Sequence, residues 1–277
     1  MAFIDEQVKS ILQQINVSVT LFISVDLSSD GTYEWCCDFS DKDSRITVMP
    51  YGDKFGGAAP NFYRLIRDVD FSYYDYVALS DQDDIWLEDK LITAVSSINK
   101  KKVHGYSSNV TAFWEDGRES VTDKAQLQRK YDYLFEAAGP GCTYVFVVEP
   151  LKKFKERLVT HSQLVNQITL HDWLLYSFFR AQGYQWLIDK TPKMYYRQHQ
   201  SNQVGINQGL KAYLKRFKLL KNGWYRQQVI NISLFIKTDT STATFNSRWL
   251  LLKNINQLRR KLSDRIFLFF IALVGLY

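Results

Sequence analysis

Apolar positions in the first quarter of the chain change their spacing from helical to strand-like and back. Between residues 4 and 15 they recur every three or four positions, which predicts an amphipathic helix. The continuous apolar run at 19–25 has the length of a buried strand, and the turn-rich stretch DLSSDGT follows it. A second short strand is predicted at 46–50, and a helix over 61–69 follows a glycine-containing loop that ends at Pro60.

The same alternation continues to about residue 200. Residues 75–80 (DYVALS) are predicted to form a buried strand, and 86–98 have helical periodicity with Asp84 placed to cap that helix. A strand-like stretch lies at 104–114, an apolar run follows GPGCT, and a further helix begins near His171. Strands separated by helices predict an α/β fold, in which a largely parallel sheet is covered by helices on both faces.

From about residue 207 the pattern is helical and basic. We therefore divide the chain into an α/β domain at 1–205 and a basic helical C-terminal region at 206–277. The chain ends in IFLFFIALVGLY, about 12 apolar residues, which is short of the roughly 20 that a membrane-spanning helix needs. Several arginines precede this tail, so it is predicted to lie on a membrane surface.

Composition narrows the classes of function. A chain of 277 residues with 46% hydrophobic content can bury a large core, which excludes global disorder. The net charge of +6 suits anionic partners such as nucleic acid, lipid headgroups or sugar diphosphates, but no zinc-finger, RRM or KH pattern accompanies it. Three cysteines, two of them adjacent, and the lack of a signal-peptide pattern indicate a reducing, cytoplasmic location.

Three carboxylates follow the predicted strand 75–80 directly. Asp81, Asp83 and Asp84 therefore lie at the carboxyl end of a strand, where open α/β sheets bind ligands. Mg²⁺ or Mn²⁺ held by such carboxylates could bind a nucleotide-sugar diphosphate, because these cations combine protein oxygens with substrate phosphates. The alternative interpretation is a solvated acidic loop that caps the next helix.

Five segments occur in an order that resembles a known family. SDQDDIW, followed by the helix containing Lys90, is accompanied by FIDEQVKSILQQ, DLSSDGT, GPGCT with HDW, and YRQHQSN. Over about residues 3–205 the chain resembles family 2 glycosyltransferases of the GT-A type, especially the rhamnosyltransferase-like group that builds O-antigens and other surface polysaccharides. The resemblance implies transfer of a sugar, preferably rhamnose from dTDP-rhamnose, onto a carbohydrate or lipid-linked acceptor at the inner face of the plasma membrane.

The resemblance also implies roles for individual residues. Asp83 matches the metal-binding aspartate of the DxD motif, and His199 matches a C-terminal histidine directed at the metal or diphosphate. The residues matched to nucleotide or donor binding are Asp26, Ser28, Asn61, Asp81, Gly141 and Arg197. An acidic pair usually stands at positions 25 and 26, whereas here only Asp26 is acidic.

Asp172 matches the catalytic base of an inverting transferase, which takes a proton from the acceptor hydroxyl. Its place at a helix N-terminus is expected to lower its pKa and keep it ionised. The alternative is that Asp172 only caps its helix.

The start of the chain departs from the family pattern. Relatives begin with a strand and a TYNG-like turn before the EQ helix, whereas Met1 is almost on that helix, so the first strand is expected to be missing. Such a loss would expose the apolar flanks of the neighbouring strands.

Two alternatives to a rhamnosyltransferase are a hexosyltransferase that uses a UDP-sugar and a catalytically impaired nucleotide-sugar-binding protein. A nucleic-acid-binding role is disfavoured, because the acidic motifs would repel phosphate in the absence of a metal.

Overall fold

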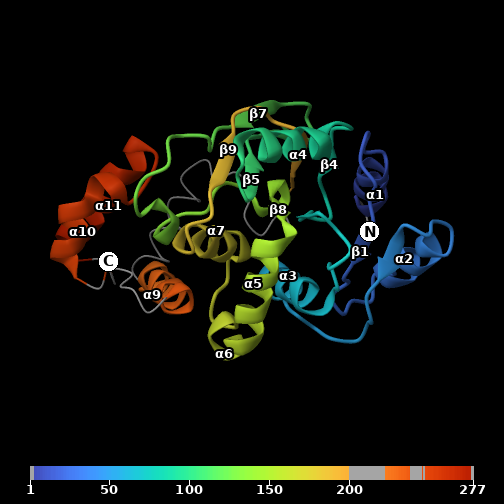
Figure 1. Cartoon of the computed structure of the whole chain (residues 1–277), viewed down its shortest axis with the longest axis horizontal. Coiled ribbons are helices and arrows are strands. Elements are labelled where there is room, and N and C mark those ends of the chain that lie inside the picture. The colour runs from blue at the N-terminus through green and yellow to red at the C-terminus, as the bar shows by residue number, and fades with distance from the viewer. Residues whose placement is uncertain (1–2, 200–221, 238–244, 246, 276–277) are drawn as a thin grey trace.

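The helices and strands are taken from a computed structural model, which describes residues 3–199, 222–237, 245 and 247–275 (Figure 1). The helices are α1 (Ile4–Leu12), α2 (Thr32–Ser40), α3 (Ala58–Asp68), α4 (Lys90–Lys101), α5 (Val148–Thr160), α6 (Ser162–Val165), α7 (His171–Ala181), α9 (Trp224–Ile236), α10 (Arg248–Asn254) and α11 (Leu262–Val274). Short 3-10 turns are η1 (Asp132–Leu134), η2 (Gly141–Thr143) and η3 (Ile255–Gln257). Figure 1 shows α1 and α2 at the opposite end of the long axis from α10 and α11.

The strands form three hydrogen-bonded groups. They are β1 (Leu21–Ile23), β2 (Ile46–Val48), β3 (Tyr76–Ala78), β4 (Ile85–Trp86), β5 (Gly105–Ser108), β6 (Val110–Trp114), β7 (Glu119–Thr122), β8 (Val145–Val147), β9 (Trp186–Asp189) and β10 (Met194–Gln198). The groups have the orders β1-β2, β4-β10-β6-β7 and β3-β8-β5-β9.

Parallel and antiparallel pairings are mixed in these sheets. β1 and β2, β5 and β9, and β6 and β10 are parallel, as a fold of alternating strands and helices predicts. β8 runs antiparallel to β3 and β5, and β7 runs antiparallel to β6. Only a short turn separates β6 from β7, and such a turn can join antiparallel neighbours but not parallel ones. The sheets are therefore more mixed than the expected parallel arrangement.

The helix after the acidic motif begins later than predicted. Residues Ile85–Trp86 form β4, which pairs with β10, and α4 begins only at Lys90, with Asp89 at the N-cap position. Asp84 is therefore not the cap of this helix. Its carboxylate instead accepts the backbone N–H of Arg197 at 3.2 Å.

One large hydrophobic core joins the α/β domain to the C-terminal helices. Side chains of α3, α5 and α7 pack in the same cluster as Ile232 and Phe235 of α9, Leu251 of α10 and Leu268 of α11. The C-terminal helices thus pack on the α/β domain. The division predicted between residues 205 and 206 lies outside the described residues.

Strands β1 and β3 each have a neighbour on one side. Among the described residues, β1 pairs only with β2 and β3 pairs only with β8. All six side chains of these two strands are half-buried. Both strands therefore present an edge, whereas β5 has a partner on each side and is fully buried.

Candidate active site

The acidic motif and the distant His199 meet in the structure. His199 Nε2 lies 2.8 Å from Asp83 Oδ2, although 116 positions separate the two residues. The cause is the pairing of β4 with β10, because β4 follows the acidic motif and β10 ends one residue before His199. The ring of Phe3 lies 5.1 Å from the His199 ring and covers it from the side of α1.

The carboxylates of this motif are crowded by negative charge. Burial raises the pKa of Asp81 to about 7, and the charges of Asp83 and Asp172 add to the effect. Burial also raises the pKa of Asp84 well above its usual range, with further contributions from Asp81 and Asp83. A divalent cation would relieve this repulsion, since it favours the ionised form of every nearby carboxylate. The charges present therefore fit a bound metal.

One group of ligand atoms in the motif is poorly suited to a hard cation. Ligand atoms of Asp81, Asp84 and Cys142 lie within 4.8 Å of one another, but Asp84 is 0% exposed and Cys142 is buried. Burial raises the pKa of the Cys142 thiol well above its usual range, which keeps it neutral and a poor ligand for a hard cation. Asp83 and His199, whose side chains lie 2.8 Å apart, offer a carboxylate and an imidazole, which are ligand types that Mg²⁺ or Mn²⁺ accepts.

Asp172 lies in the first turn of α7, as predicted, but its pKa moves in the opposite direction from the one expected. Burial raises the pKa from 3.8 to about 6, and this outweighs the hydrogen bonds at the helix N-terminus, which lower it. The positive charge of Lys124 also lowers the pKa of Asp172. The expectation of a lowered pKa is therefore wrong, because it considered the helix dipole without desolvation. At neutral pH the carboxylate is still largely ionised.

Gly141 brings the GPG loop directly against Asp172. A Cβ atom placed on Gly141 would lie 2.5 Å from His171 Nε2 and 3.2 Å from Asp172 Cβ. A distance of 2.5 Å is far inside van der Waals contact, so position 141 requires glycine. His171 Nε2 is buried without a hydrogen-bond partner among the described residues, and its ring stacks on Phe62 at 4.1 Å.

Arg197 links the acidic motif to helix α1 through hydrogen bonds. Its Nε donates to the backbone carbonyl of Asp83 at 2.9 Å, and its Nη2 donates to the Glu6 carboxylate of α1. The guanidinium also lies 4.5 Å from the ring centre of Phe3 and 4.6 Å from that of Phe113. Sequence reasoning assigned Arg197 to phosphate and missed Glu6, because an ion pair across 191 positions leaves no local pattern.

Of the residues matched to nucleotide binding, Asp26 and Ser28 lie in the loop after β1, and Asn61 lies in the first turns of α3. The Asp26 carboxylate accepts the backbone N–H groups of Phe55 and Gly56 at 2.6 and 2.8 Å. The Ser28 hydroxyl donates within its own turn at 2.7 Å, and the Asn61 amide donates at 3.0 Å to a carbonyl just after β1. These side chains fix the loops that follow β1 and β2.

Lys90 is a further charged residue beside the acidic motif. It is 2% exposed, and its Nζ lies 3.5 Å from the ring centre of Trp86. Burial lowers the pKa of Lys90 to about 7, while the charge of Asp84 opposes this shift. The sequence placed Lys90 on the helix after the motif, but not its burial.

Comparison with known proteins gives consistent results. The family model described as glycosyl transferase family 2 matches residues 2–156. The chain is 43% identical over 281 residues to the dTDP-rhamnosyl transferase RfbG of Shigella flexneri, covering 99% of this chain and 97% of that protein. It is 26% identical over 146 residues to the Escherichia coli UDP-Glc:alpha-D-GlcNAc-diphosphoundecaprenol beta-1,3-glucosyltransferase WfgD, covering 51% and 53% of the two chains.

A solved structure shares the fold. The S. aureus TarS 1–349 complex with UDP-GlcNAc superposes with a TM-score of 0.57 at 13% sequence identity, over 99% of this chain and 77% of that one. At this identity the likeness concerns the fold alone. It agrees with the expected α/β fold of the GT-A type.

Proposed function

The chain belongs to glycosyl transferase family 2, and on that premise we propose that it transfers rhamnose from dTDP-rhamnose to a carbohydrate or lipid-linked acceptor. The observation that carries the choice of donor is the 43% identity, over almost the whole chain, to a protein named as a dTDP-rhamnosyl transferase. The resemblance of its motifs to the rhamnosyltransferase-like group supports a role in O-antigen or other surface-polysaccharide synthesis.

Asp172 is the proposed catalytic base. The acceptor hydroxyl oxygen attacks the anomeric carbon of the donor sugar while the bond from that carbon to the diphosphate oxygen breaks on the opposite face. The acceptor proton passes to the Asp172 carboxylate, so dTDP leaves and the anomeric configuration inverts. Two observations support the assignment: Asp172 lies against Gly141, and its charge reaches Asp81 of the acidic motif. A carboxyl with a pKa of about 6 is ionised at neutral pH yet basic enough to accept the proton.

Asp83 and His199 are the proposed holders of a Mg²⁺ or Mn²⁺ ion, with Asp81 beside the nucleotide ribose or the metal. When bound, the ion would neutralise charge on the departing diphosphate. The contact between Asp83 and His199 and the crowding of the carboxylates support this assignment. Arg197 is proposed to keep the Asp83 backbone in position and to contact phosphate through its guanidinium as a second role.

Asp26, Ser28 and Asn61 are proposed to form the nucleotide side of the donor site. Their hydrogen bonds fix the loops that follow β1 and β2. We propose that these loops bind the base and ribose, while Gly141 lets the backbone of η2 approach the donor sugar closely.

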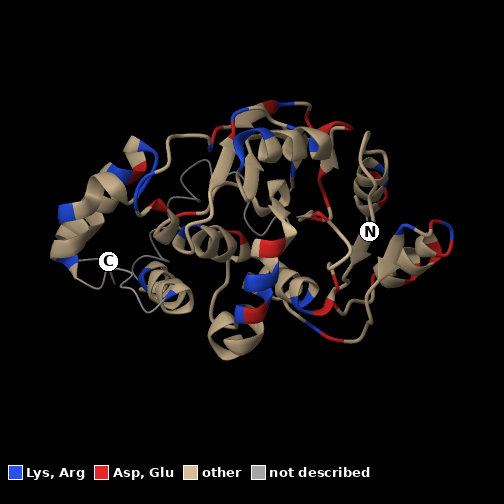
Figure 2. Ribbon diagram, viewed as in Figure 1, with Lys and Arg blue, Asp and Glu red and all other residues tan. Residues whose placement is uncertain are grey.

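The C-terminal helices are proposed to dock on the cytoplasmic face of the plasma membrane. None of the described helices is both long and apolar enough to cross a bilayer. The outward face of α11 is instead almost entirely apolar, formed by Leu262, Ile266, Phe267, Phe269, Phe270, Leu273 and Val274, all exposed. Figure 2 shows basic residues on α10 and at the start of α11, where one acidic residue also lies, and uncharged ribbon over the rest of α11; basic residues beside an apolar face suit anionic lipid.

Substitutions on the outward face test this docking without damaging the core. Phe267→Ser together with Phe270→Ser should reduce sedimentation with anionic vesicles, because both side chains point away from the protein. Leu268 is 3% exposed in the core, so deletion of the whole helix would unfold its neighbours and would not isolate docking. Full-length protein that ignores such vesicles would argue against the membrane proposal.

A donor screen tests the proposed reaction. Purified protein is incubated with Mn²⁺, a panel of dTDP- and UDP-sugars and candidate acceptors, and nucleoside diphosphate release is measured. Faster turnover of dTDP-rhamnose supports the proposal. Preference for UDP-glucose would favour the second candidate, to which the partial likeness to WfgD points. Binding of donors without turnover would identify a catalytically impaired protein.

A further inference from the structure

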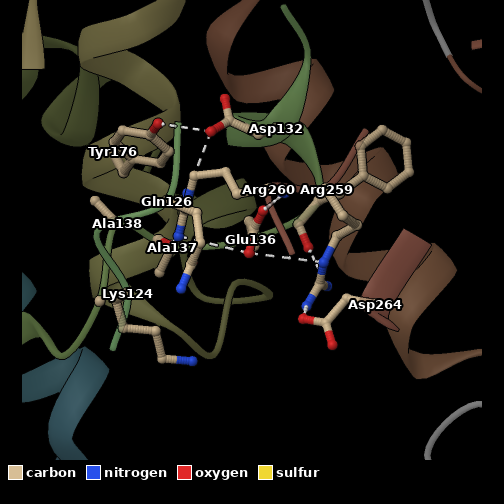
Figure 3. A network of polar contacts seen from close by, with 12 residues as sticks. Lys124, Gln126, Asp132, Glu136, Ala137, Ala138, Tyr176, Arg259, Arg260 and Asp264 are labelled. Atoms are coloured by element: carbon tan, nitrogen blue, oxygen red, sulfur yellow. Dashed lines mark hydrogen bonds and ion pairs between the residues drawn. The ribbon is translucent and has the colours of Figure 1, made fainter. Parts of the chain in front are cut away.

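A second buried cluster of charges joins the C-terminal region to the active-site loop (Figure 3). Arg260, just after η3, has a side chain that is only 1% exposed. Its Nη1 lies 3.2 Å from Asp132 Oδ2, and its Nη2 donates to the backbone carbonyl of Ala137 at 2.6 Å. Its backbone N–H donates to the Glu136 carboxylate at 2.6 Å. One residue thus contacts three points of the segment 132–137.

Arg259 adds a second set of contacts to the same segment. Its Nη1 donates to the carbonyl of Phe135 at 2.8 Å, and the hydroxyl of Tyr225 from α9 donates to that carbonyl at 2.7 Å. The Nη2 of Arg259 donates to the carboxylate of Asp264 of α11 at 2.9 Å. The backbone carbonyls at 135 and 137 are therefore both held by the C-terminal region.

Asp132 connects this cluster to the helix that carries the proposed base. Besides Arg260, it accepts the hydroxyl of Tyr176 at 3.0 Å and Nη1 of Arg180 at 3.2 Å. Both of these residues lie on α7, whose first turn contains Asp172. The position of the segment is thus tied to the helix of the base as well as to the C-terminal arginines.

The same segment runs directly into the active site. The carbonyl of Ala138 accepts the Ser107 hydroxyl at 2.8 Å. A Cβ on Gly139 would lie 3.5 Å from Lys124, and two positions later Gly141 meets Asp172. The backbone that Arg260 holds at Ala137 is therefore four residues from the contact with the proposed base.

We propose that Arg260 is a positioning residue for glycosyl transfer, which holds the segment 132–141 so that the acceptor hydroxyl meets Asp172 in attacking geometry. Arg259 supports it by fixing the carbonyl of Phe135. The C-terminal helices are then part of the catalytic unit, in addition to any docking they perform. The inference rests on the proposed role of Asp172 as the base.

The chemistry of the side chain favours positioning over simple stabilisation. A buried ion pair adds little to stability compared with well-packed apolar residues, because both charges must leave water. A guanidinium, however, is planar and offers several donors in fixed directions. It can therefore hold the Asp132 carboxylate and the Ala137 carbonyl in one geometry, which a lysine ammonium cannot reproduce. A misplacement of about 1 Å near reacting groups can cost about 100-fold in rate.

The test compares Arg260→Lys and Arg260→Met with Arg118→Met, which removes an exposed arginine from the turn between β6 and β7. The measured quantity is the ratio of sugar transfer to hydrolysis of the donor by water. This ratio does not depend on the fraction of folded protein, so a purely structural role leaves it unchanged. We expect Arg260→Met to lower it at least about tenfold and Arg260→Lys to lower it by less, whereas Arg118→Met stays within about twofold of wild type.

Amide hydrogen exchange provides a readout that needs no donor. In Arg260→Lys, residues 132–141 should exchange faster than in wild type and in Arg118→Met. A folded Arg260→Lys protein with the wild-type ratio and wild-type exchange would overturn the inference. If Arg260→Met does not fold, the inference is tested with Arg260→Lys alone. If no donor is turned over, amide hydrogen exchange is the test. Asp172→Asn is run in parallel: normal transfer by that variant would remove the base assignment and leave the Arg260 result separate.

Discussion

Two groups of carboxylates in this protein have different electrostatic surroundings. Asp132 and Glu136 meet arginine guanidinium groups from α7 and from the C-terminal region. The pKa values of Asp81, Asp84 and Asp172 are instead raised, mainly by desolvation, and neighbouring carboxylates add to the effect for Asp81 and Asp84. A carboxylate that is ion-paired within the protein stabilises the structure. A carboxylate whose pKa is raised can bind a metal ion or accept a proton from a substrate, which is what a catalytic site requires.

The largest expected effect is on the metal side of the site. Asp83→Ala should reduce transfer at least about 10³-fold, because the departing diphosphate would lose the ion that offsets its charge. Initial rates with saturating dTDP-rhamnose and Mn²⁺ measure this. Excess EDTA should reproduce the loss in wild type, and undiminished turnover in EDTA would contradict the metal assignment.

Disrupting the carboxylate group formed by Asp132 and Glu136, which is paired with arginines, should lower the stability strongly. Asp132→Asn removes one of the two carboxylates that pair with the buried Arg260 guanidinium, the other being Glu136, and breaking a buried ion pair typically costs about 3–5 kcal/mol of unfolding free energy. Urea unfolding followed by circular dichroism measures the change. The matched control is Asp116→Asn, which removes an exposed ion pair with Arg118 and should cost at most about 1 kcal/mol. Equal losses of unfolding free energy in both variants would show that the buried ion pairs of Asp132 contribute no more to stability than an exposed ion pair.

Asp172→Asn should give the opposite result from Asp132→Asn. Transfer should fall at least about 10²-fold, because the acceptor proton has no base to receive it. The melting temperature should stay level or rise, since an amide is less costly to bury than a carboxylate whose pKa burial has raised. Rates and thermal melts of the same preparation test both parts. Wild-type turnover would leave Asp172 only a structural role at the start of α7.

The smallest expected effect concerns pH. The base form of Asp172 is lost as pH falls through its pKa of about 6, so kcat/KM should decline on the acidic side of that value. Lys124 lowers this pKa through its charge, so Lys124→Gln should raise the pKa and move the acidic limb to higher pH. The shift should diminish with added salt, because Lys124 is exposed. If the acidic limb of the kcat/KM–pH profile does not move in Lys124→Gln, the charge of Lys124 does not affect the pKa of Asp172.

The sequence predicted the elements with strong periodicity. The first helix, the strand near Leu21 and the helix that begins at His171 are found where apolar spacing places them. Strand β4 was missed because two residues show no period, and with it the late start of α4. The resemblance to a family directed both Asp83 and His199 at the metal or diphosphate, whereas their direct contact was not predicted, since no local pattern links positions so far apart.

Other parts of the site could not be read from the chain in advance. The direction of the Asp172 pKa depends on burial, which follows from packing and not from the HDW motif. The pairing of Arg260 with Asp132 spans 128 positions and depends on how the C-terminal region folds back on the domain. In the sequence, Arg260 is only one of several basic residues in LRRKLSDR.

The fit of Gly141 against His171 has an evolutionary consequence. Every amino-acid replacement at position 141 adds a Cβ that would collide with the imidazole at 2.5 Å. A homologue that has lost this glycine should therefore also have lost the bulky ring at 171, so the two positions should change together across the family. Selection acting on either site alone would find few acceptable neutral steps. We expect descendants to retain the pair or to replace both members within a short interval of divergence.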